Sequence, residues 1–375
     1  MKIGIDISQI VYETGVSTYT ENLVKSLLKL DKKNEYVIFG TSLRQYGKLK
    51  KFAEKLSSSN NVNVKLFRAP ITLFEVLFNK IRIFGINKII GEVDILHTSD
   101  WIEPKVSPGV SKVTTIHDMV PFLFPATLPK RILKNQRRRM DIVKKESSII
   151  ITPSKSARDD IIKFLDISSE KIRVTPEAAT LEFKPKPEDE INNVLSKFRI
   201  KKPYILSVGT QEPRKNIHTL IDAFENLAKE RSDITLVLTG KKGWGQALDI
   251  VPNTIQTGFV TKDELVALYA GCKVFVYPSL YEGFGLPVLE AMACGAPVVT
   301  SNNSAMAEIA ENAAILINPR TEGQIKKAVE LILDLNTDDY QKMVRASLDR
   351  ARQFTWAKTA KETLKIYEEL ERSHA

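Results

Sequence analysis

Two glutamates, Glu282 and Glu290, stand in one glycine-rich segment, and their spacing suits the binding of a nucleotide-linked ligand. The segment, residues 281–299, reads YEGFGLPVLEAMACGAPVV. An apolar run, Val274–Tyr277, comes before it and predicts a buried strand. Pro287 suits the first position of a helix, and Gly295 suits the residue that follows its end. One carboxylate is therefore expected in a loop at a helix N-terminus, and the other one turn inside the helix.

This layout could bind both a phosphate and a ribose. Free backbone N–H groups and the helix dipole favour an anion at the N-terminus. Side chains on a helix lean toward its N-terminus, so Glu290 could accept hydrogen bonds from a ribose diol. Glu282, as a loop residue, is expected to be exposed and to contribute little to the core. The alternative interpretation is a helix start with two solvated glutamates.

A second group of chemical side chains lies in residues 208–216, which read VGTQEPRKN. This string follows a predicted strand and opens a helix. Gly209 permits a tight turn there, and Arg214 and Lys215 stand at the helix start, where cations oppose the dipole. An anionic ligand would explain them, because Arg binds phosphate oxygens bidentately and Lys adds a compact charge. The alternative is a pair of ordinary solvated cations.

Two further loops of the first half contain candidate residues. Residues 114–121, TTIHDMVP, end an apolar strand with His117 and Asp118. The carboxyl ends of strands in open α/β sheets face the ligand crevice, so His117 could hydrogen-bond a sugar hydroxyl, whereas Asp118 is expected to orient the loop. Residues 12–19, YETGVSTY, precede a helix and place Gly15 before it.

Together these strings resemble the donor-site signature of retaining nucleotide-sugar glycosyltransferases of family four (group 1), which have two Rossmann-like domains, the GT-B fold. The resemblance implies that Glu282 contacts the donor sugar, Glu290 the ribose, and Arg214 with Lys215 the diphosphate. It also implies that His117 faces the donor sugar and that Gly15 approaches the phosphates, although Val16 and Ser17 replace the second glycine common in the family. The other donor-binding residues that it implies are Gly209, Gly283, Phe284, Gly285 and Leu286.

The resemblance also bears on the donor and on metals. The stretch 239–244, TGKKGW, and the string around Arg214 look most like the mannosyltransferase branch, which makes GDP-mannose the first choice of donor and UDP-glucose the second. No Asp-x-Asp motif occurs in the chain. We therefore expect no metal and no cofactor beyond the nucleotide-sugar co-substrate, with Arg214 and Lys215 neutralising the leaving group.

The elements that must position these residues alternate between strands and helices, which predicts an α/β fold with mostly parallel sheets. The Pro- and charge-rich stretch 184–190 is the best linker signal. We expect an acceptor-side domain over 1–183 and a nucleotide-sugar domain over 184–355, facing each other across a deep cleft. The predicted helix 356–372 belongs, by resemblance, to a C-terminal segment (356–375) that crosses back onto the first domain. Predicted strands cover residues 2–7, 36–39, 62–67, 95–97, 112–116, 148–152, 173–175, 204–208, 235–239, 255–257 and 274–277.

Composition limits the partners and the compartment. The chain has 375 residues, 43% hydrophobic and 27% charged, without a signal peptide or an uninterrupted spanning helix. Two cysteines indicate a reducing, cytoplasmic setting. The first 180 residues carry 30 Lys and Arg against 19 Asp and Glu, whereas the remainder carries 25 against 26. This excess of positive charge includes the cations of the predicted helical segment 130–139. It suits an anionic partner, which could be the inner membrane surface, a lipid diphosphate acceptor or nucleic acid. The alternative is a soluble basic surface with no partner.

The function predicted from these features is the transfer of a sugar from a nucleotide-sugar donor to a glycan or lipid-linked acceptor. The transfer retains the configuration at the anomeric carbon and serves polysaccharide or glycoconjugate synthesis. One alternative keeps the fold and changes the reaction: a nucleotide-sugar 2-epimerase, which needs carboxylates poised for proton transfer that the sequence does not show. A nucleic-acid-binding protein, suggested by the pI of about 9.3, lacks a basic motif interleaved with aromatics. We therefore expect no nucleic-acid partner.

Overall fold

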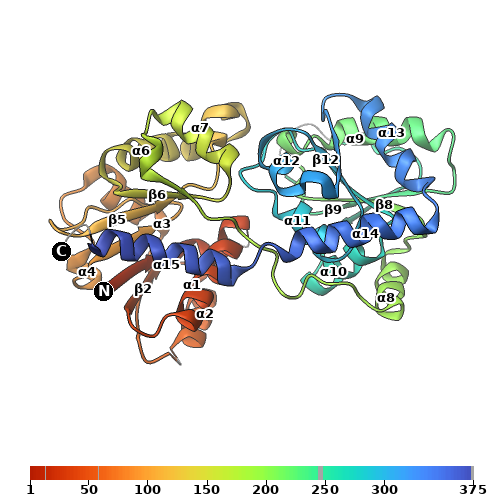
Figure 1. Ribbon diagram of the computed structural model, residues 1–375. Coiled ribbons are helices and arrows are strands. Elements are labelled where there is room, and N and C mark those ends of the chain that lie inside the picture. Colours follow the sequence, from red (N-terminus) through yellow and green to blue (C-terminus); the bar gives the residue numbers. More distant parts are fainter. Residues whose placement is uncertain (13, 58, 244–247, 373–375) are drawn as a thin grey trace. The chain divides into compact units, whose positions relative to one another are not determined.

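The computed structural model describes residues 1–12, 14–57, 59–243 and 248–372 and divides into two α/β units (Figure 1). Unit 1 comprises Met1–Glu177 together with Trp356–Ala375, and unit 2 comprises Ala178–Thr355. Each unit contains one sheet whose strand pairs are all parallel. The predicted α/β fold with two Rossmann-like domains is confirmed.

Unit 1 has a seven-stranded sheet in the order β3-β2-β1-β4-β5-β6-β7. Its strand order reverses between β1 and β4, and the carboxyl ends of these two strands form the topological switch point of the sheet. The strands are β1 (Lys2–Asp6), β2 (Glu35–Thr41), β3 (Val62–Phe67), β4 (Ile95–Thr98), β5 (Ser111–Thr115), β6 (Ile149–Thr152) and β7 (Ile172–Val174).

Helices cover both faces of this sheet in Figure 1. The α-helices of unit 1 are α1 (Gly15–Leu30), α2 (Tyr46–Leu56), α3 (Ile71–Glu75), α4 (Asn87–Ile90), α5 (Val120–Leu123), α6 (Lys130–Glu146), α7 (Lys155–Leu165) and α15 (Trp356–Arg372). Shorter turns are the 3-10 helices η1 (Ser8–Tyr12), η3 (Pro125–Thr127) and η4 (Ser169–Lys171) and the π-helix η2 (Val76–Ile81).

Unit 2 has a six-stranded sheet in the order β10-β9-β8-β11-β12-β13, with its switch point between β8 and β11. The strands are β8 (Tyr204–Val208), β9 (Thr235–Thr239), β10 (Thr254–Gly258), β11 (Val274–Tyr277), β12 (Val298–Ser301) and β13 (Ile315–Ile317). The helices are α8 (Glu188–Phe198), η5 (Pro213–Lys215), α9 (Ile217–Ala228), α10 (Lys262–Gly271), α11 (Leu286–Ala293), α12 (Ser304–Ala310), η6 (Glu311–Ala313), α13 (Glu322–Leu333) and α14 (Thr337–Arg352).

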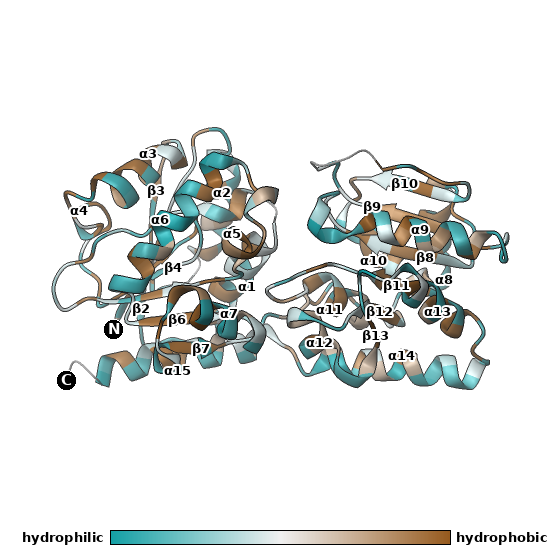
Figure 2. Cartoon of the chain, turned by 90° about the horizontal axis from the view of Figure 1, so that it is seen from above, coloured by the Kyte–Doolittle hydropathy of each residue, from teal (hydrophilic) through white to brown (hydrophobic). Residues whose placement is uncertain are grey.

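Most strands inside each sheet, away from the edge strands β3 and β10, are apolar along most of their length because both of their faces are covered. Their mostly brown ribbons stand out against the teal of many helix faces in Figure 2. In unit 2, α9 and α13 build one core against the sheet, and α8, α10, α11 and α14 build the other. Strands such as Val274–Tyr277 are buried at every residue, so the carboxyl ends that follow them are held rigidly.

The C-terminal helix α15 packs on unit 1, as the resemblance implied. It lies against α1, and the Tyr367 hydroxyl lies 2.6 Å from Nδ1 of the buried His97 at the centre of the sheet. Thr359 donates a hydrogen bond to the carbonyl of Pro176 at 2.6 Å. The helix is therefore an integral part of unit 1.

The stretch that we interpreted as a linker is partly helical. Glu188, Asp189 and Glu190 form the first turn of α8, where acidic side chains are favoured by the helix dipole. Phe183, just before this stretch, is buried in the core of unit 2. The Pro-rich residues therefore lead into a helix of unit 2, and the two units meet along the chain at Glu177 and Ala178.

Candidate functional site

The loop between β11 and α11 places Glu282 at the switch point of unit 2. Gly285 is the N-cap of α11 and has a φ of 104°, a left-handed conformation that glycine adopts at little cost. Pro287 is the second helical residue, one position later than predicted, and its missing N–H is still harmless in the first turn. Gly295 follows the helix with a φ of 83°. The glycine and proline positions thus fix both ends of the short helix.

Glu282 is largely buried, which contradicts the expectation of an exposed loop carboxylate. Its side chain is 12% exposed, and both oxygens are engaged. Oε1 accepts hydrogen bonds from Lys215 Nζ at 2.6 Å, from Ser279 Oγ at 2.7 Å and from the Tyr277 hydroxyl at 2.9 Å. Oε2 lies 2.9 Å from Nη1 of Arg214. The carboxylate is therefore an organising group of the site.

Charge governs the ionisation of this cluster. Burial acts to raise the pKa of Glu282, but the nearby charges of Arg214 and Lys215 outweigh it and hold the pKa at about 2. Burial also lowers the pKa of Lys215 below its usual value, against the opposing effect of Glu282. Glu282 is consequently ionised throughout the neutral range and can act there as a hydrogen-bond acceptor, not as a proton donor.

Arg214 and Lys215 are held by the loop that follows β8. They lie in the 3-10 turn η5, and Arg214 donates to the carbonyl of Tyr281 at 2.7 Å and pairs with Glu212. Asn216 ends the turn in a left-handed conformation, with a φ of 57°. Its amide donates to the carbonyls of Pro278 and Pro319. These bonds tie the β8 loop to the loops that follow β11 and β13 and so fix both cations beside Glu282.

Gly209 lies where the β8 and β9 loops approach each other most closely. A Cβ placed on Gly240 would stand 2.0 Å from the carbonyl oxygen of Gly209, and the φ of Gly240 is 142°. A Cβ on Gly209 would lie 3.8 Å from the Lys215 side chain. The backbone of both loops can therefore run close to a ligand that contacts Lys215.

Glu290 occupies a different electrostatic setting from Glu282. It lies in α11 and accepts a long hydrogen bond, 3.3 Å, from the Tyr269 hydroxyl. Burial raises the pKa of Glu290 to about 7, against the opposing effects of the hydrogen bond from Tyr269 and of the charge of Lys262. Glu290 is therefore a carboxyl group that changes its protonation near neutral pH.

The remaining residues of the 281–299 segment differ in what they offer a ligand. The ring of Phe284 is buried and packs edge-on against Phe354, with ring centroids 6.0 Å apart, so that side chain belongs to the core. Leu286 also packs against this core. Gly283 and Gly285 lie in the turn before α11.

In unit 1, His117 follows β5 and is mostly buried. Its Nδ1 lies 3.2 Å from Oε1 of Glu177, and its ring meets that of Tyr19 edge-on, with centroids 4.7 Å apart. Nε2 of His117 is buried without a hydrogen-bond partner among the described residues. Asp118 accepts a hydrogen bond from the N–H of Val120 at 2.9 Å and orients the loop, as expected. Gly15 begins α1, after the N-cap Thr14.

The structure thus gathers Arg214, Lys215 and Glu282 within unit 2, while His117 and Gly15 belong to unit 1. Sequence reasoning missed Tyr277, Ser279, Glu212 and Glu177. Glu212 and Ser279 could have been found, because each lies in a loop that directly follows a predicted strand at the switch point. The contact of Glu177 with His117 joins residues 60 positions apart and left no local signal.

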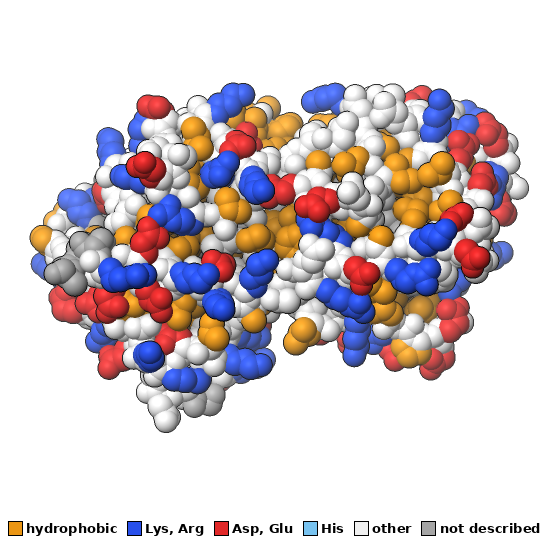
Figure 3. Space-filling view, viewed as in Figure 1, with side chains coloured by type: hydrophobic (Ala, Val, Ile, Leu, Met, Phe, Trp, Pro, Cys, Tyr) orange, Lys and Arg blue, Asp and Glu red, His pale blue; other side chains and the backbone are white. Residues whose placement is uncertain are grey.

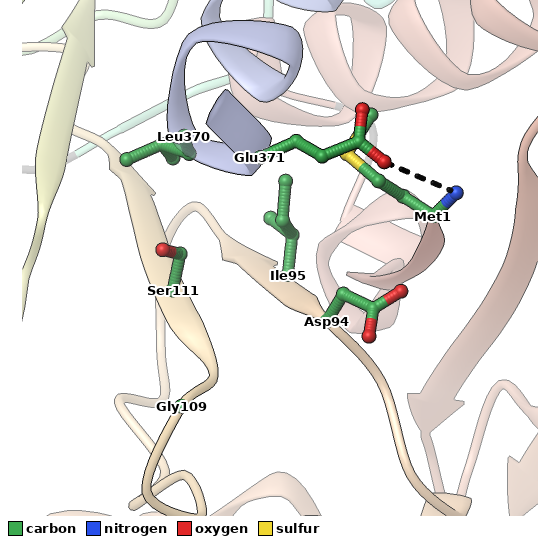
Figure 4. Close-up of a pocket in the computed structure, with 7 residues that line it drawn as sticks. All are labelled: Met1, Asp94, Ile95, Gly109, Ser111, Leu370 and Glu371. Carbon is green, nitrogen blue, oxygen red and sulfur yellow. Dashed lines mark ion pairs between the residues drawn. The ribbon is translucent and has the colours of Figure 1, made fainter. Parts of the chain in front are cut away.

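Other surfaces of unit 1 lie away from these residues. A pocket of about 330 Å³ is shown in Figure 4, at the amino ends of the strands. Its dashed line marks the ion pair of 3.9 Å between the Met1 amino group and Glu371. This is the edge of the sheet opposite to the switch point. The lining residues are Met1, Asp94, Ile95, Gly109, Ser111, Leu370 and Glu371.

No three or more His, Cys, Asp or Glu side chains of the described residues gather in an arrangement that could hold a metal ion. No helix in the described ranges has the length and apolar character needed to cross a membrane.

Comparison with known proteins identifies relatives of both units. Residues 14–183 match the family described as Glycosyltransferase Family 4, and residues 190–350 match Glycosyl transferases group 1. The O-antigen chain mannosyltransferase B of Escherichia coli is 32% identical over 268 residues, which are 68% of this chain and 69% of that protein. The serotype-specific mannosyltransferase WbdA of Escherichia coli is 31% identical over 66% of this chain, which spans only 32% of that longer protein.

Solved structures share the fold at low sequence identity. Sucrose-phosphate synthase from Thermosynechococcus elongatus superposes with a TM-score of 0.71 at 16% identity and covers 100% of both chains. Anabaena HepE, solved with UDP and glucose, gives a TM-score of 0.72 at 16% identity, over 98% of this chain and 100% of that one. These likenesses bear on the fold alone.

Proposed function

The chain belongs to the group 1 (family 4) glycosyltransferases, and we propose that it moves mannose, with retention of configuration, from GDP-mannose to a glycan or lipid-linked acceptor. The relatives named as O-antigen mannosyltransferases support the choice of sugar and a role in polysaccharide synthesis. In this proposal unit 2 is the donor domain and unit 1 the acceptor domain.

The observation that carries the proposal is the cluster of Arg214, Lys215 and Glu282 at the switch point of unit 2. When a sugar leaves a nucleotide diphosphate, negative charge develops on the phosphate oxygens. Two fixed cations in a largely buried site stabilise that charge without reorganising. Glu282 accepts a hydrogen bond from a sugar hydroxyl through Oε2, which pairs with Arg214 alone among the described residues, and Glu290 accepts hydrogen bonds from the ribose. We propose that the two cations do this in place of a metal ion.

The bonding of Glu282 supports same-face substitution over a covalent intermediate. A nucleophilic carboxylate needs a free oxygen directed at the anomeric carbon, but Oε1 accepts three hydrogen bonds and Oε2 pairs with Arg214. A pKa near 2 also makes Glu282 a weak nucleophile. The departing phosphate then takes the proton of the acceptor hydroxyl, and His117 supports the sugar.

The donor is tested by nucleotide binding followed by product analysis. Calorimetry with GDP and UDP on the same preparation should give the tighter binding to GDP. Incubation with GDP-mannose and a mannose-terminated acceptor should yield an α-linked product. The one-bond coupling between C1 and H1 of the transferred mannose, measured by NMR, identifies the linkage. Tighter UDP binding with turnover of UDP-glucose would refute the donor assignment, and a β-linked product would refute retention.

We further propose that the protein acts in the cytoplasm and touches the inner membrane through α6 and the α3–η2 segment. The outward side chains Leu73, Val76, Ile81 and Ile83 of this segment and the residues next to it are exposed, Ile83 by 80%. Arg131 of α6 pairs with Glu75 at 3.0 Å, which places the basic helix beside them. Apolar side chains flanked by cations suit an anionic bilayer surface. The exposed cations of α6 are Lys130, Arg131, Lys134, Arg137, Lys144 and Lys145.

Charge on other parts of unit 1 is more evenly mixed. On the face seen in Figure 3, Lys and Arg alternate with Asp and Glu, so the basic excess does not form one continuous patch there. The α6 side is therefore the surface to test. Sedimentation with phosphatidylglycerol vesicles should remove the wild-type protein from solution, and Ile83→Asp should weaken this. Leu331→Asp, at an equally apolar residue of unit 2 that is 58% exposed, should not. Equal binding to neutral phosphatidylcholine vesicles would refute the charge argument.

A further inference from the structure

Glu212 is a carboxylate beside the phosphate-binding cations, and sugar transfer itself does not require it. It is the N-cap of η5, and its side chain is only 10% exposed. Its N–H donates to the carbonyl of Thr210 at 2.9 Å, and its carbonyl accepts from the N–H of Lys215 at 3.0 Å, so the backbone fixes its place. The carboxylate pairs with Nη2 of Arg214. An anion of the protein thus stands next to a cation that must bind an anionic ligand.

The charges of this cluster cancel within the protein. Nη1 of Arg214 lies 2.9 Å from Oε2 of Glu282, and Nζ of Lys215 lies 2.6 Å from Oε1 of the same carboxylate. Glu212 adds the second negative charge beside Arg214. All four side chains are only 10–14% exposed, so water screens their charges little. Two cations that would form a strongly positive phosphate site are therefore already balanced by two carboxylates.

The charge of Glu212 reaches beyond its ion pair with Arg214. Burial lowers the pKa of Lys215, and the charges of Glu282 and Glu212 both oppose this effect. Glu212 therefore acts on both cations of the site. If this carboxylate were neutral, Arg214 and Lys215 would share Glu282 alone, and a largely buried group would carry a net positive charge.

Sugar transfer increases the negative charge on the nucleotide. Both phosphates of GDP-mannose are esterified, whereas GDP ends in a phosphate whose second ionisation lies near about pH 6. At neutral and higher pH the product therefore carries more charge than the donor. A strongly positive site would bind GDP more tightly than GDP-mannose, and the enzyme would be held by its own product. An electroneutral site reduces this difference.

We propose that Glu212 sets the charge balance of the donor site so that the nucleotide diphosphate product is released. It offsets one of the two cations, which lowers the affinity for GDP more than the affinity for GDP-mannose. This role rests on the proposed function and makes it more specific, because it names the residue that limits product affinity. The alternative role, in which Glu212 only braces Arg214 for the phosphate, predicts the opposite sign: its loss would weaken GDP binding.

Calorimetry with GDP at pH 8 tests this role. Glu212→Gln keeps the shape and removes the charge, and it should tighten GDP binding about tenfold. Glu212→Ser, a neutral residue that suits an N-cap, should shift the affinity in the same direction. Glu212→Asp keeps the charge and should bind GDP much as the wild type does. The control Glu225→Gln, at an exposed carboxylate of α9, should change GDP affinity less than about twofold.

Product inhibition provides a second readout on the same proteins. In Glu212→Gln the inhibition constant of GDP, measured against GDP-mannose, should fall about tenfold. The KM for GDP-mannose should fall by a smaller factor, because the donor carries less charge. A residue that only braces Arg214 would raise both constants.

Three results would overturn the charge balance. One is weaker or unchanged GDP binding in both Glu212→Gln and Glu212→Ser. Another is equal tightening by Glu225→Gln, which would trace the effect to the overall charge of the unit. The third is a Glu212→Asp variant that behaves like Glu212→Gln. A wrong donor is a separate outcome: UDP would then bind more tightly than GDP and UDP-glucose would be turned over, while Glu212→Gln would still tighten UDP binding.

Discussion

Replacing Glu282 with Gln should cost the protein both stability and activity. The pKa of Glu282 is held at about 2 against an ordinary value of 4.5, a shift that corresponds to roughly 3 kcal/mol of stability at neutral pH. The side chain is only 12% exposed, so solvent screening removes little of this. The amide keeps the shape, but Arg214 and Lys215 lose their shared counter-charge while they stay largely buried.

The pH dependence of stability provides a second, independent test of this prediction. A carboxylate whose folded-state pKa is depressed stabilises the fold fully above its unfolded pKa, and that contribution is lost as the pH falls toward the folded value. The gap between wild type and Glu282→Gln should therefore be full at pH 7 and shrink between about pH 4.5 and pH 2. Urea unfolding of both proteins at pH 7, 4 and 3 measures this difference in unfolding free energy. The unfolding transition to follow is the one that GDP shifts.

Nucleotide should partly rescue the variant. The diphosphate of GDP supplies the charge that the two cations have lost, so GDP should raise the unfolding midpoint of Glu282→Gln more than that of wild type. Turnover should still fall by at least a hundredfold, because the sugar loses a charged hydrogen-bond acceptor. A difference in unfolding free energy below about 1 kcal/mol at pH 7, or wild-type turnover, would refute the reasoning.

Three further predictions concern neighbouring groups. Arg214→Ala and Lys215→Ala should each lower turnover about ten- to a hundredfold, and wild-type activity should survive EDTA; loss in chelator that Mg²⁺ or Mn²⁺ restores would contradict the role given to the cations. GDP affinity should rise about tenfold from pH 6 to pH 8 as Glu290 ionises, and Glu290→Gln should flatten this profile if the carboxylate binds the ribose. Gly240→Ala should abolish GDP binding through its clash with Gly209, whereas Gly258→Ala, also at positive φ but in open space, should only lower the unfolding midpoint.

The strands were predictable because their signal is local. Residues 204–208, 235–239 and 274–277 are apolar runs bounded by glycine, proline or charge, and the structure has strands with these same bounds. The C-terminal helix 356–372 was equally clear from its amphipathic pattern. In each case the apolar residues that become buried lie within the element itself, in the spacing typical of a strand or a helix.

The setting of the candidate site residues was not predictable in the same way. The strands β9, β10 and β11 and the helices α9 and α10 lie between Arg214 and Glu282 in the chain, so the burial and low pKa of Glu282 have no local signature. Glu282 and Glu290 stand in one short string, and burial acts to raise both pKa values. The charges of Arg214 and Lys215 outweigh burial at Glu282, whereas burial outweighs Tyr269 and Lys262 at Glu290. The stretch 184–190 misled because its acidic residues, which resemble a solvated linker, also suit a helix N-terminus.

The placement of α15 on unit 1 has a consequence for biosynthesis. Unit 1 is discontinuous, since the whole of unit 2 is inserted between Glu177 and Trp356. During translation, the first 177 residues emerge while the helix that covers α1 and reaches His97 has not yet been made. Unit 2, which is continuous, can complete its core on the ribosome, whereas unit 1 must wait until α15 has been made. A helix synthesised after the whole of unit 2 is thus the one that completes unit 1.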